Sequence, residues 1–216
     1  MPRSEVPREQ RAFAYVRIGA PDRHGRRMCR SYLVPINRDG EKVDAPCAED
    51  DPFIGHFECR FEATIDVSGH VRLERLVGQS PDSPHMWFVV VDDSARTGRD
   101  TRSIVGFATD HFVDGTIIDE MEFVMLSVSN EQQIAAIQWS RTDGTVEQIY
   151  VNSVYRRSHV GLRMGQTAGA YHQVCGWPGV VHASGKRTAM GQAFATGGVA
   201  AVRVGRHEEL SPPMDT

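Results

Sequence analysis

Helical periodicity becomes clear only late in this chain, after a long run of segments that look like strands. From residue 158 onward, apolar side chains recur every three or four positions and so share one face of an α-helix: Val160, Met164, Ala168, Tyr171 and Cys175. Gly176 and Pro178 then give the usual signals for the end of a helix. A further strand, helix and strand are expected after it, at 179–184, 186–198 and 199–205. This order predicts an α+β or mixed α/β fold.

The segments before this helix have the β-branched and aromatic content of strands. Strands are expected at 12–18 and 31–36, with residues 19–30 as a basic, turn-rich connection. Residues 56–77 alternate apolar and polar positions and predict an antiparallel hairpin that turns at Ser68 and Gly69; a strand followed by a short helix is the alternative. Five further strand candidates follow, at 86–93, 103–113, 123–129, 135–140 and 145–151.

Composition limits the classes of protein to which the chain can belong. A length of 216 residues fits one domain with an extension, and the net charge of -4 argues against a general nucleic-acid coat, although a local basic patch remains allowed. The longest apolar run, residues 86–91, is far shorter than the roughly 20 residues of a membrane helix. The N-terminus has no apolar signal core. We therefore expect a cytoplasmic protein with no membrane segment.

The four cysteines are expected to be free thiols, because their spacing fits no metal knuckle: Cys29, Cys47, Cys59 and Cys175. Cys175 can be imagined as an acyl-carrying nucleophile, but it falls on the apolar face of the helix, which favours a small buried side chain. The nine histidines show no metal-binding spacing, so no metal site is expected.

The segment 145–164 carries the strongest chemical signal: a strand, a turn, two arginines and a helix start. The first backbone N–H groups of a helix lack partners and lie at the positive end of its dipole, which makes them a phosphate site. Arg156 and Arg157 add positive charge, Gly161 permits close approach of a ligand, and Ser158 is placed to cap the helix.

The sequence YVNSVYRRSHVG within this segment resembles motif A of the GNAT superfamily of N-acetyltransferases. Arg156 stands at the motif's Arg/Gln position, Val160 at its aliphatic position and Gly161 at its Gly/Ala position. His159 occupies the place of the first glycine, and Asn152 with Ser153 replaces the common Asp-Pro. The resemblance implies that the His159 side chain occupies the space nearest the pyrophosphate, where it would either loosen cofactor binding or place a hydrogen-bond donor against phosphate.

The resemblance covers residues 85–205 and implies a fold. A GNAT-like protein has a mostly antiparallel sheet that splays between its fourth and fifth strands to admit pantetheine. The fourth strand corresponds to 145–151, the fifth to 179–184, and the helix at 187–197 to the fourth helix. The expected domains are a largely β N-terminal extension (1–80), an acyl-CoA-binding domain (81–206) and a disordered tail (207–216).

The resemblance also implies a function, the direct transfer of an acyl group, expected to be acetyl, from acyl-CoA to an amine acceptor of unknown identity. The co-substrate, acetyl-CoA or another acyl-CoA, would contact the backbone of Ile149, Tyr150 and Val151. Its pyrophosphate would meet a run at the helix start: Arg156, Arg157, Ser158, His159, Val160, Gly161 and Leu162.

Glu147 is the candidate general base, acting on the amine through water; a solvated strand carboxylate is the alternative. Relatives use a tyrosine on the fourth helix as general acid, and this chain has none there. Ser184 is the nearest hydroxyl, with Tyr171 and Thr188 behind it, and His182 is a candidate to line the acceptor channel.

Two further functions stay open. One is a GNAT-like enzyme that modifies a nucleobase amine in DNA or RNA, supported by the basic residues 23–30. The other is an inactive GNAT-like scaffold, suggested by His159 and by the missing tyrosine. Association into a homodimer is also left open.

Overall fold

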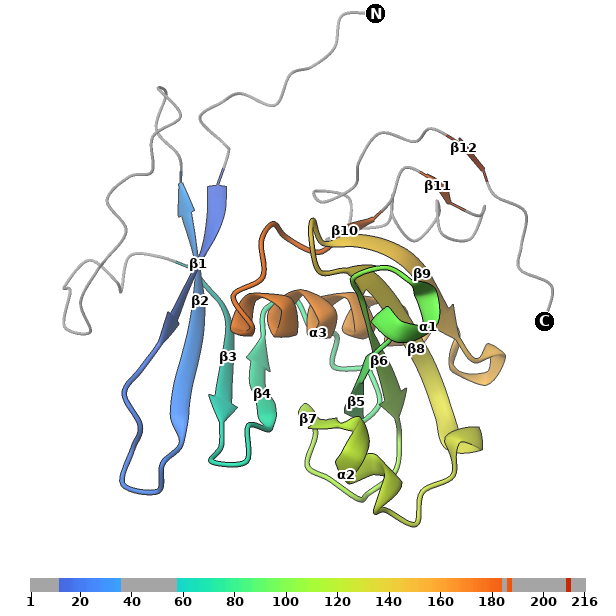
Figure 1. Ribbon diagram of the computed structural model, residues 1–216, viewed down its shortest axis with the longest axis horizontal. Coiled ribbons are helices and arrows are strands. Elements are labelled where there is room, and N and C mark those ends of the chain that lie inside the picture. The colour runs from blue at the N-terminus through green and yellow to red at the C-terminus, as the bar shows by residue number, and fades with distance from the viewer. Residues whose placement is uncertain (1–11, 36–57, 184–185, 188–208, 211–216) are drawn as a thin grey trace, which may run out of the picture.

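The computed structural model describes residues 12–35, 58–183, 186–187 and 209–210. Ten strands of this part form one open sheet, and a single long helix crosses one of its faces (Figure 1). In chain order the elements are β1 (Ala12–Ile18), β2 (Arg27–Pro35), β3 (Glu58–Ile65), β4 (Val71–Leu76), β5 (Trp87–Asp92), α1 (Ser94–Thr97), β6 (Thr101–Phe107), β7 (Thr116–Asp119), α2 (Glu120–Val124), η3 (Asn130–Gln132), β8 (Gln133–Ser140), β9 (Thr145–Val151), η4 (Ser153–Tyr155), α3 (Val160–Val174), β10 (His182–Ala183), β11 (Lys186–Arg187) and β12 (Glu209–Leu210). The fold is therefore α+β, and the sheet dominates it.

The strands of the large sheet follow the order β1-β2-β3-β4-β7-β5-β6-β8-β9-β10. Neighbours in this sheet are antiparallel except for β5 with β7 and β9 with β10. β4 joins the N-terminal strands to the remainder through Val71 opposite Ile117 and Arg72 opposite Thr116. The sheet is therefore continuous across residue 80, where a domain boundary was expected.

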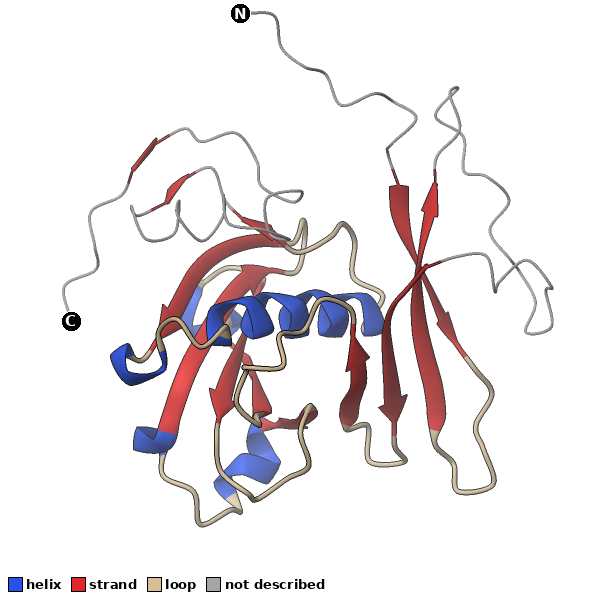
Figure 2. Ribbon diagram, turned by 180° about the vertical axis from the view of Figure 1, so that it is seen from behind, coloured by secondary structure: helices blue, strands red, loops and turns tan. Residues whose placement is uncertain are grey.

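Each face of the sheet carries its own apolar core. On one face, α3 packs against alternate residues of the central strands, such as Ile104 and Ile137, which are almost fully buried. Figure 2 shows α3 lying across the strands. Gly106 lets α3 come close, because a Cβ there would lie 2.7 Å from Cε of Met86 and 3.0 Å from Sδ of Met164.

The opposite face is covered by α2 and its flanking loops. Trp87 stacks on Phe107 with ring centroids 4.7 Å apart, and Phe123 of α2 packs against both rings. Asp119 caps α2 by accepting a hydrogen bond from the backbone N–H of Glu122 at 2.8 Å. This cap and the aromatic contacts hold the short helix against the sheet.

Several expected strands are confirmed and three details are corrected. The strands at 12–18, the hairpin turning at Ser68 and Gly69, and β5, β8 and β9 lie where the sequence predicts them. Residues 27–30 are part of β2 rather than of a turn, and β6 ends at Phe107 rather than at 113. The strand expected at 123–129 is wrong: α2 occupies 120–124, and the short strand β7 precedes it.

The chain after α3 differs from the expected strand, helix and strand. Of the strand expected at 179–184, His182–Ala183 form β10. A helix beginning at 186 is wrong, because Lys186–Arg187 form β11 and pair in parallel with Glu209–Leu210. The rest of that helix, the strand expected at 199–205 and residues 211–216 lie outside the described residues.

Candidate functional site

The candidate site begins on β9, whose pairing with β8 is interrupted at one residue. Gln148 lies opposite Gln138 and Val146 opposite Trp139, so Glu147 is an extra residue with no partner on β8. Such a β-bulge bends the strand and redirects a side chain, and bulges are frequent beside active sites. It places Glu147 outside the regular ladder.

The other edge of β9 is paired over a short distance. Within the described part of the chain, β10 contacts β9 at two positions, Thr145 with His182 and Val146 with Ala183. From 147 to 151, no described strand continues this pairing. An open strand edge offers N–H and C=O groups to which an extended molecule can hydrogen-bond. Among the described residues, the open part of β9 runs from the bulge to the end of the strand, where the chain turns toward α3.

A short connection that contains η4 joins β9 to α3. Asn152 fixes its first half, because its backbone N–H donates to the carbonyl of Ile134 at 2.8 Å and its side chain accepts from the N–H of Val154 at 3.1 Å. The hydroxyl of Ser158 donates to the carbonyl of Tyr155 at 2.6 Å. The capping role expected for Ser158 is therefore wrong: the N-cap residue is His159, whose side chain makes no capping hydrogen bond.

His159 adopts a backbone conformation that glycine normally supplies. Its φ of 59° and the φ of 69° at Arg157 both lie in the left-handed region. The carbonyl of His159 accepts the first intrahelical hydrogen bond, from the N–H of Arg163 at 3.0 Å. The N–H groups of Val160, Gly161 and Leu162 precede that bond and have no partner within the helix.

Arg156 and Arg157 lie in this connection, shortly before the start of α3. Arg156 is exposed, and its Nε donates to the carbonyl of Val151 at 3.3 Å, which ties the side chain to the end of β9. Arg157 is also exposed. Val160 is 1% exposed and anchors the helix start in the core. The arrangement joins an open strand edge, two guanidinium groups and the positive end of a 15-residue helix.

Glu147 forms an ion pair with a residue that sequence reasoning did not single out. Nη1 of Arg99, in the loop between α1 and β6, lies 3.4 Å from both carboxylate oxygens of Glu147. The Arg99 side chain is 71% exposed and that of Glu147 is 27% exposed. The carboxylate is thus held at the surface of β9 with access to water. The two residues are 48 positions apart in the sequence, so no local pattern indicates that they meet.

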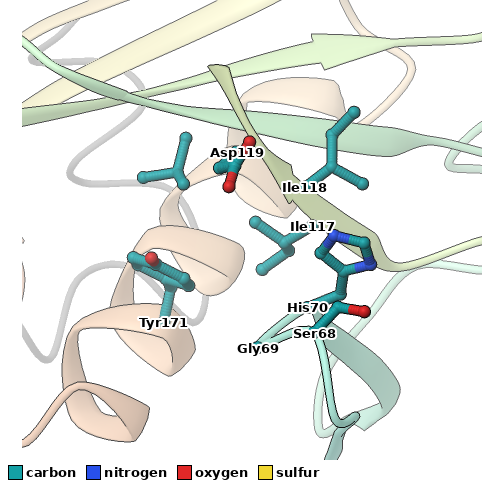
Figure 3. A pocket seen from close by; sticks show the side chains of 8 residues that line it. Ser68, Gly69, His70, Ile117, Ile118, Asp119 and Tyr171 are labelled. Carbon is teal, nitrogen blue, oxygen red and sulfur yellow. The ribbon is translucent and has the colours of Figure 1, made fainter. Parts of the chain in front are cut away.

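The structure does not bring Tyr171 to Glu147. Tyr171 points from α3 toward β7 and the β3–β4 turn, where it lines a hollow of about 50 Å³ with His70, Ile117 and Asp119 (Figure 3). Val90 of β5 also lines it, and β6 and β8 separate β5 from β9. The hollow is much smaller than typical ligand pockets of about 300 Å³ or more. Burial, followed by the proximity of Cys175, raises the pKa of the Tyr171 phenol.

His172 and His182 have different settings. His172 is fully buried between Trp139 and the carbonyl of Pro178. His182 lies on β10, with Nε2 3.3 Å from Oγ1 of Thr145 and Nδ1 2.8 Å from the carbonyl of Val180. It therefore sits at the paired end of β9 and β10, away from the open edge.

Comparisons of the chain with profiles of known protein families, with curated proteins and with solved structures found no match. Among the described residues, no helix combines the length and apolar character needed to cross a bilayer. In the same part of the chain, no three or more His, Cys, Asp or Glu side chains are grouped to hold a metal ion.

Cys29 and Cys175 differ in exposure. Cys175 is exposed at the C-cap of α3, so its expected burial is wrong. Cys29 is buried, and burial raises the pKa of its thiol to about 12. Ser184 and Thr188 lie outside the described residues.

Proposed function

We propose that this chain is a GNAT-like N-acyltransferase that moves an acetyl or similar acyl group from acyl-CoA to an amine. One observation carries the proposal: the open edge of β9 is followed in the chain by a short connection with two arginines and then by the N-terminus of α3. An extended chain ending in phosphates has the complementary shape and charge. Pantetheine with its pyrophosphate is such a molecule.

The open edge of β9 supports the binding of pantetheine. Its two amide groups can pair with the backbone of Ile149, Tyr150 and Val151 as a short added strand would. Such pairing depends on backbone geometry, so the identity of the side chains at these positions does not indicate whether pantetheine binds there. The two-residue contact between β9 and β10 supports a splayed pair of parallel strands.

The start of α3 supports the binding of pyrophosphate. The N–H groups of Val160, Gly161 and Leu162 and the helix dipole favour an anion there, and Arg156 and Arg157 stand beside them. The left-handed φ of His159 supports the alignment with motif A, because this is the conformation for which a glycine is suited. His159 thus has the backbone conformation that suits the motif's glycine, although it carries a side chain where glycine has none.

The bulge at Glu147 supports direct attack on the thioester. We assign two roles to this residue. Its carboxylate accepts a proton from the attacking amine through water, and its backbone N–H polarises the thioester carbonyl. The amine nitrogen bonds to the carbonyl carbon, the C–S bond breaks, and the CoA thiolate leaves and takes up a proton. Ion pairing with Arg99 holds the carboxylate in place.

Calorimetric titration with acetyl-CoA and with CoA tests the proposal. We expect micromolar binding of both by the wild type, at least ten-fold weaker binding by Arg156→Ala, and unchanged binding by Arg23→Ala, an exposed arginine on the β1–β2 turn. A protein that binds both ligands would then be screened against amine acceptors. If neither ligand binds, the acyltransferase proposal fails, and a scaffold function takes its place.

A further inference from the structure

The charges of the chain are unevenly distributed. Residues 103–140 contain no Lys or Arg and six carboxylates: Asp110, Asp114, Asp119, Glu120, Glu122 and Glu131. The described strands β1 to β4 and the turns that join β1 to β2 and β3 to β4 instead hold eight arginines against five carboxylates: Arg17, Arg23, Arg26, Arg27, Arg30, Arg60, Arg72 and Arg75, with Asp22, Glu58, Glu62, Asp66 and Glu74. A chain with a modest net charge thus has one acidic and one basic region.

The acidic region contains a patch of exposed apolar side chains on α2. Met121 is 77%, Val124 is 72% and Met125 is 84% exposed, and their spacing places them on one side of the helical turn. Val113 in the preceding loop is 62% exposed. We call these four residues and the carboxylates beside them the α2 surface. Exposed apolar side chains gathered in this way mark an interaction site.

The basic region also exposes apolar side chains, at the turns of its two hairpins. Val67 of the β3–β4 turn is 77% exposed, and Ile18 and Met28 near the β1–β2 turn are 46% and 38% exposed. The two turns touch, because a Cβ added to Gly25 would lie 2.5 Å from Cγ1 of Val67. Arg23, Arg26 and Arg27 are exposed in the β1–β2 turn and at the start of β2, and Arg26 pairs with Asp22 at 2.9 Å; these arginines and the apolar side chains form the hairpin surface.

The two surfaces lie at the same end of the molecule. The β1–β2 turn, the β3–β4 turn and α2 all lie at the lower end in Figure 1 and Figure 2. A direct contact joins them, since Nε2 of His70, beside the β3–β4 turn, lies 2.5 Å from Oε2 of Glu122 on α2. This end is therefore one continuous strip with a basic half and an acidic half.

We propose that two copies of this chain form a two-fold dimer through this strip, with the α2 surface of each copy packed on the hairpin surface of the other. A two-fold interface has to be self-complementary, and a strip with opposite charges in its two halves meets that condition. The apolar side chains form the centre of each contact and the charges its rim. Within one chain, the two surfaces cannot close on each other because both are fixed to the same sheet.

A second copy fits this strip better than other partners. A nucleic acid would bind the arginines of the hairpin surface but would be repelled by the carboxylates of the neighbouring α2 surface. A basic peptide would bind the α2 surface and leave Ile18, Met28 and Val67 exposed. The proposal is independent of acyl transfer, because neither surface includes residues assigned to the acyl-CoA site.

Sedimentation equilibrium of the full chain, at about 1 to 100 μM and at low and high salt, tests this proposal. We expect a dimer that weakens as salt is raised. Met125→Glu and Arg27→Glu are each expected to weaken the dimer at least ten-fold, whereas Val154→Glu, at an 83% exposed position on η4, leaves it intact. All three positions are exposed, and circular dichroism and thermal melting establish that each variant folds.

Three outcomes would overturn the proposal. One is a wild type that stays monomeric over the whole concentration range. Another is a dimer that neither Met125→Glu nor Arg27→Glu weakens. The third is a monomer that binds duplex DNA through Arg27, which would assign the hairpin surface to a polyanion.

Discussion

The indole N–H of Trp139 donates a hydrogen bond to Nδ1 of His172 over 3.0 Å, while Nε2 of the same ring lies 2.9 Å from the carbonyl of Pro178. The indole can only donate and the carbonyl can only accept. This pair of partners selects the neutral imidazole with its proton on Nε2. The ring thereby links β8, α3 and the segment that leads to β10.

Protonation of His172 is expected to destabilise the fold. Burial lowers its pKa in the folded state, so below about pH 6.5 the unfolded chain binds a proton that the folded chain excludes. Its contribution to stability is present above that pH and is lost as the pH falls toward the folded-state pKa. Melting temperatures between pH 7.5 and 5 should therefore fall less steeply for His172→Gln than for the wild type. His85→Gln, at an exposed position, is the control and should follow the wild type; equal slopes in all three proteins would contradict this role.

The sequence predicted the elements with strong local patterns. The apolar repeat from Val160 to Cys175 located α3, and alternation located the β3–β4 hairpin. Residues 123–129 were mistaken for a strand because four apolar residues in succession fit either a strand or a helical turn. Their packing on Trp87 and the cap from Asp119 favour the helix, and neither contact is visible in a local pattern.

The candidate site was predictable in part. The helix start proposed to bind phosphate could be located from Arg156, Arg157 and Gly161, because such a site is built from consecutive residues. The bulge at Glu147 depends on the register between β8 and β9, and the contact with Arg99 spans 48 residues. Features of this kind arise from strand pairing and have no signature in the sequence of one strand.

The left-handed backbone at His159 leads to a prediction about stability. His159→Gly should stabilise the fold by up to about 1 kcal/mol, because glycine adopts this φ without steric cost. His159→Val should destabilise it by about 1–3 kcal/mol, since a β-branched residue tolerates this region poorly. Urea denaturation measures both changes. Ser158→Gly is the matched control and should not stabilise; a destabilised His159→Gly would refute the argument.

The His159→Gly substitution also tests the proposed acyl-CoA site. If the pyrophosphate lies against the start of α3, removal of the imidazole lets it approach the backbone more closely, and His159→Gly should bind acetyl-CoA more tightly than the wild type. Calorimetry on the variant used for denaturation gives this value. Weaker binding would show that the imidazole itself donates to the phosphate.

The roles of Glu147 and Arg99 can be distinguished by the effect of each substitution on kcat. Glu147→Gln should lower kcat by about 10²- to 10⁴-fold, as expected when a general base is removed, while the Kd for acetyl-CoA stays unchanged. Arg99→Ala should lower kcat by less than ten-fold, because an ion pair with an arginine that is 71% exposed contributes little and the carboxylate remains. Release of the CoA thiol, followed with a thiol-reactive dye and an acceptor found by screening, measures both. Glu131→Gln, an exposed carboxylate on η3, should match the wild type. Full turnover by Glu147→Gln would remove this residue from the mechanism, even with acyl-CoA binding intact.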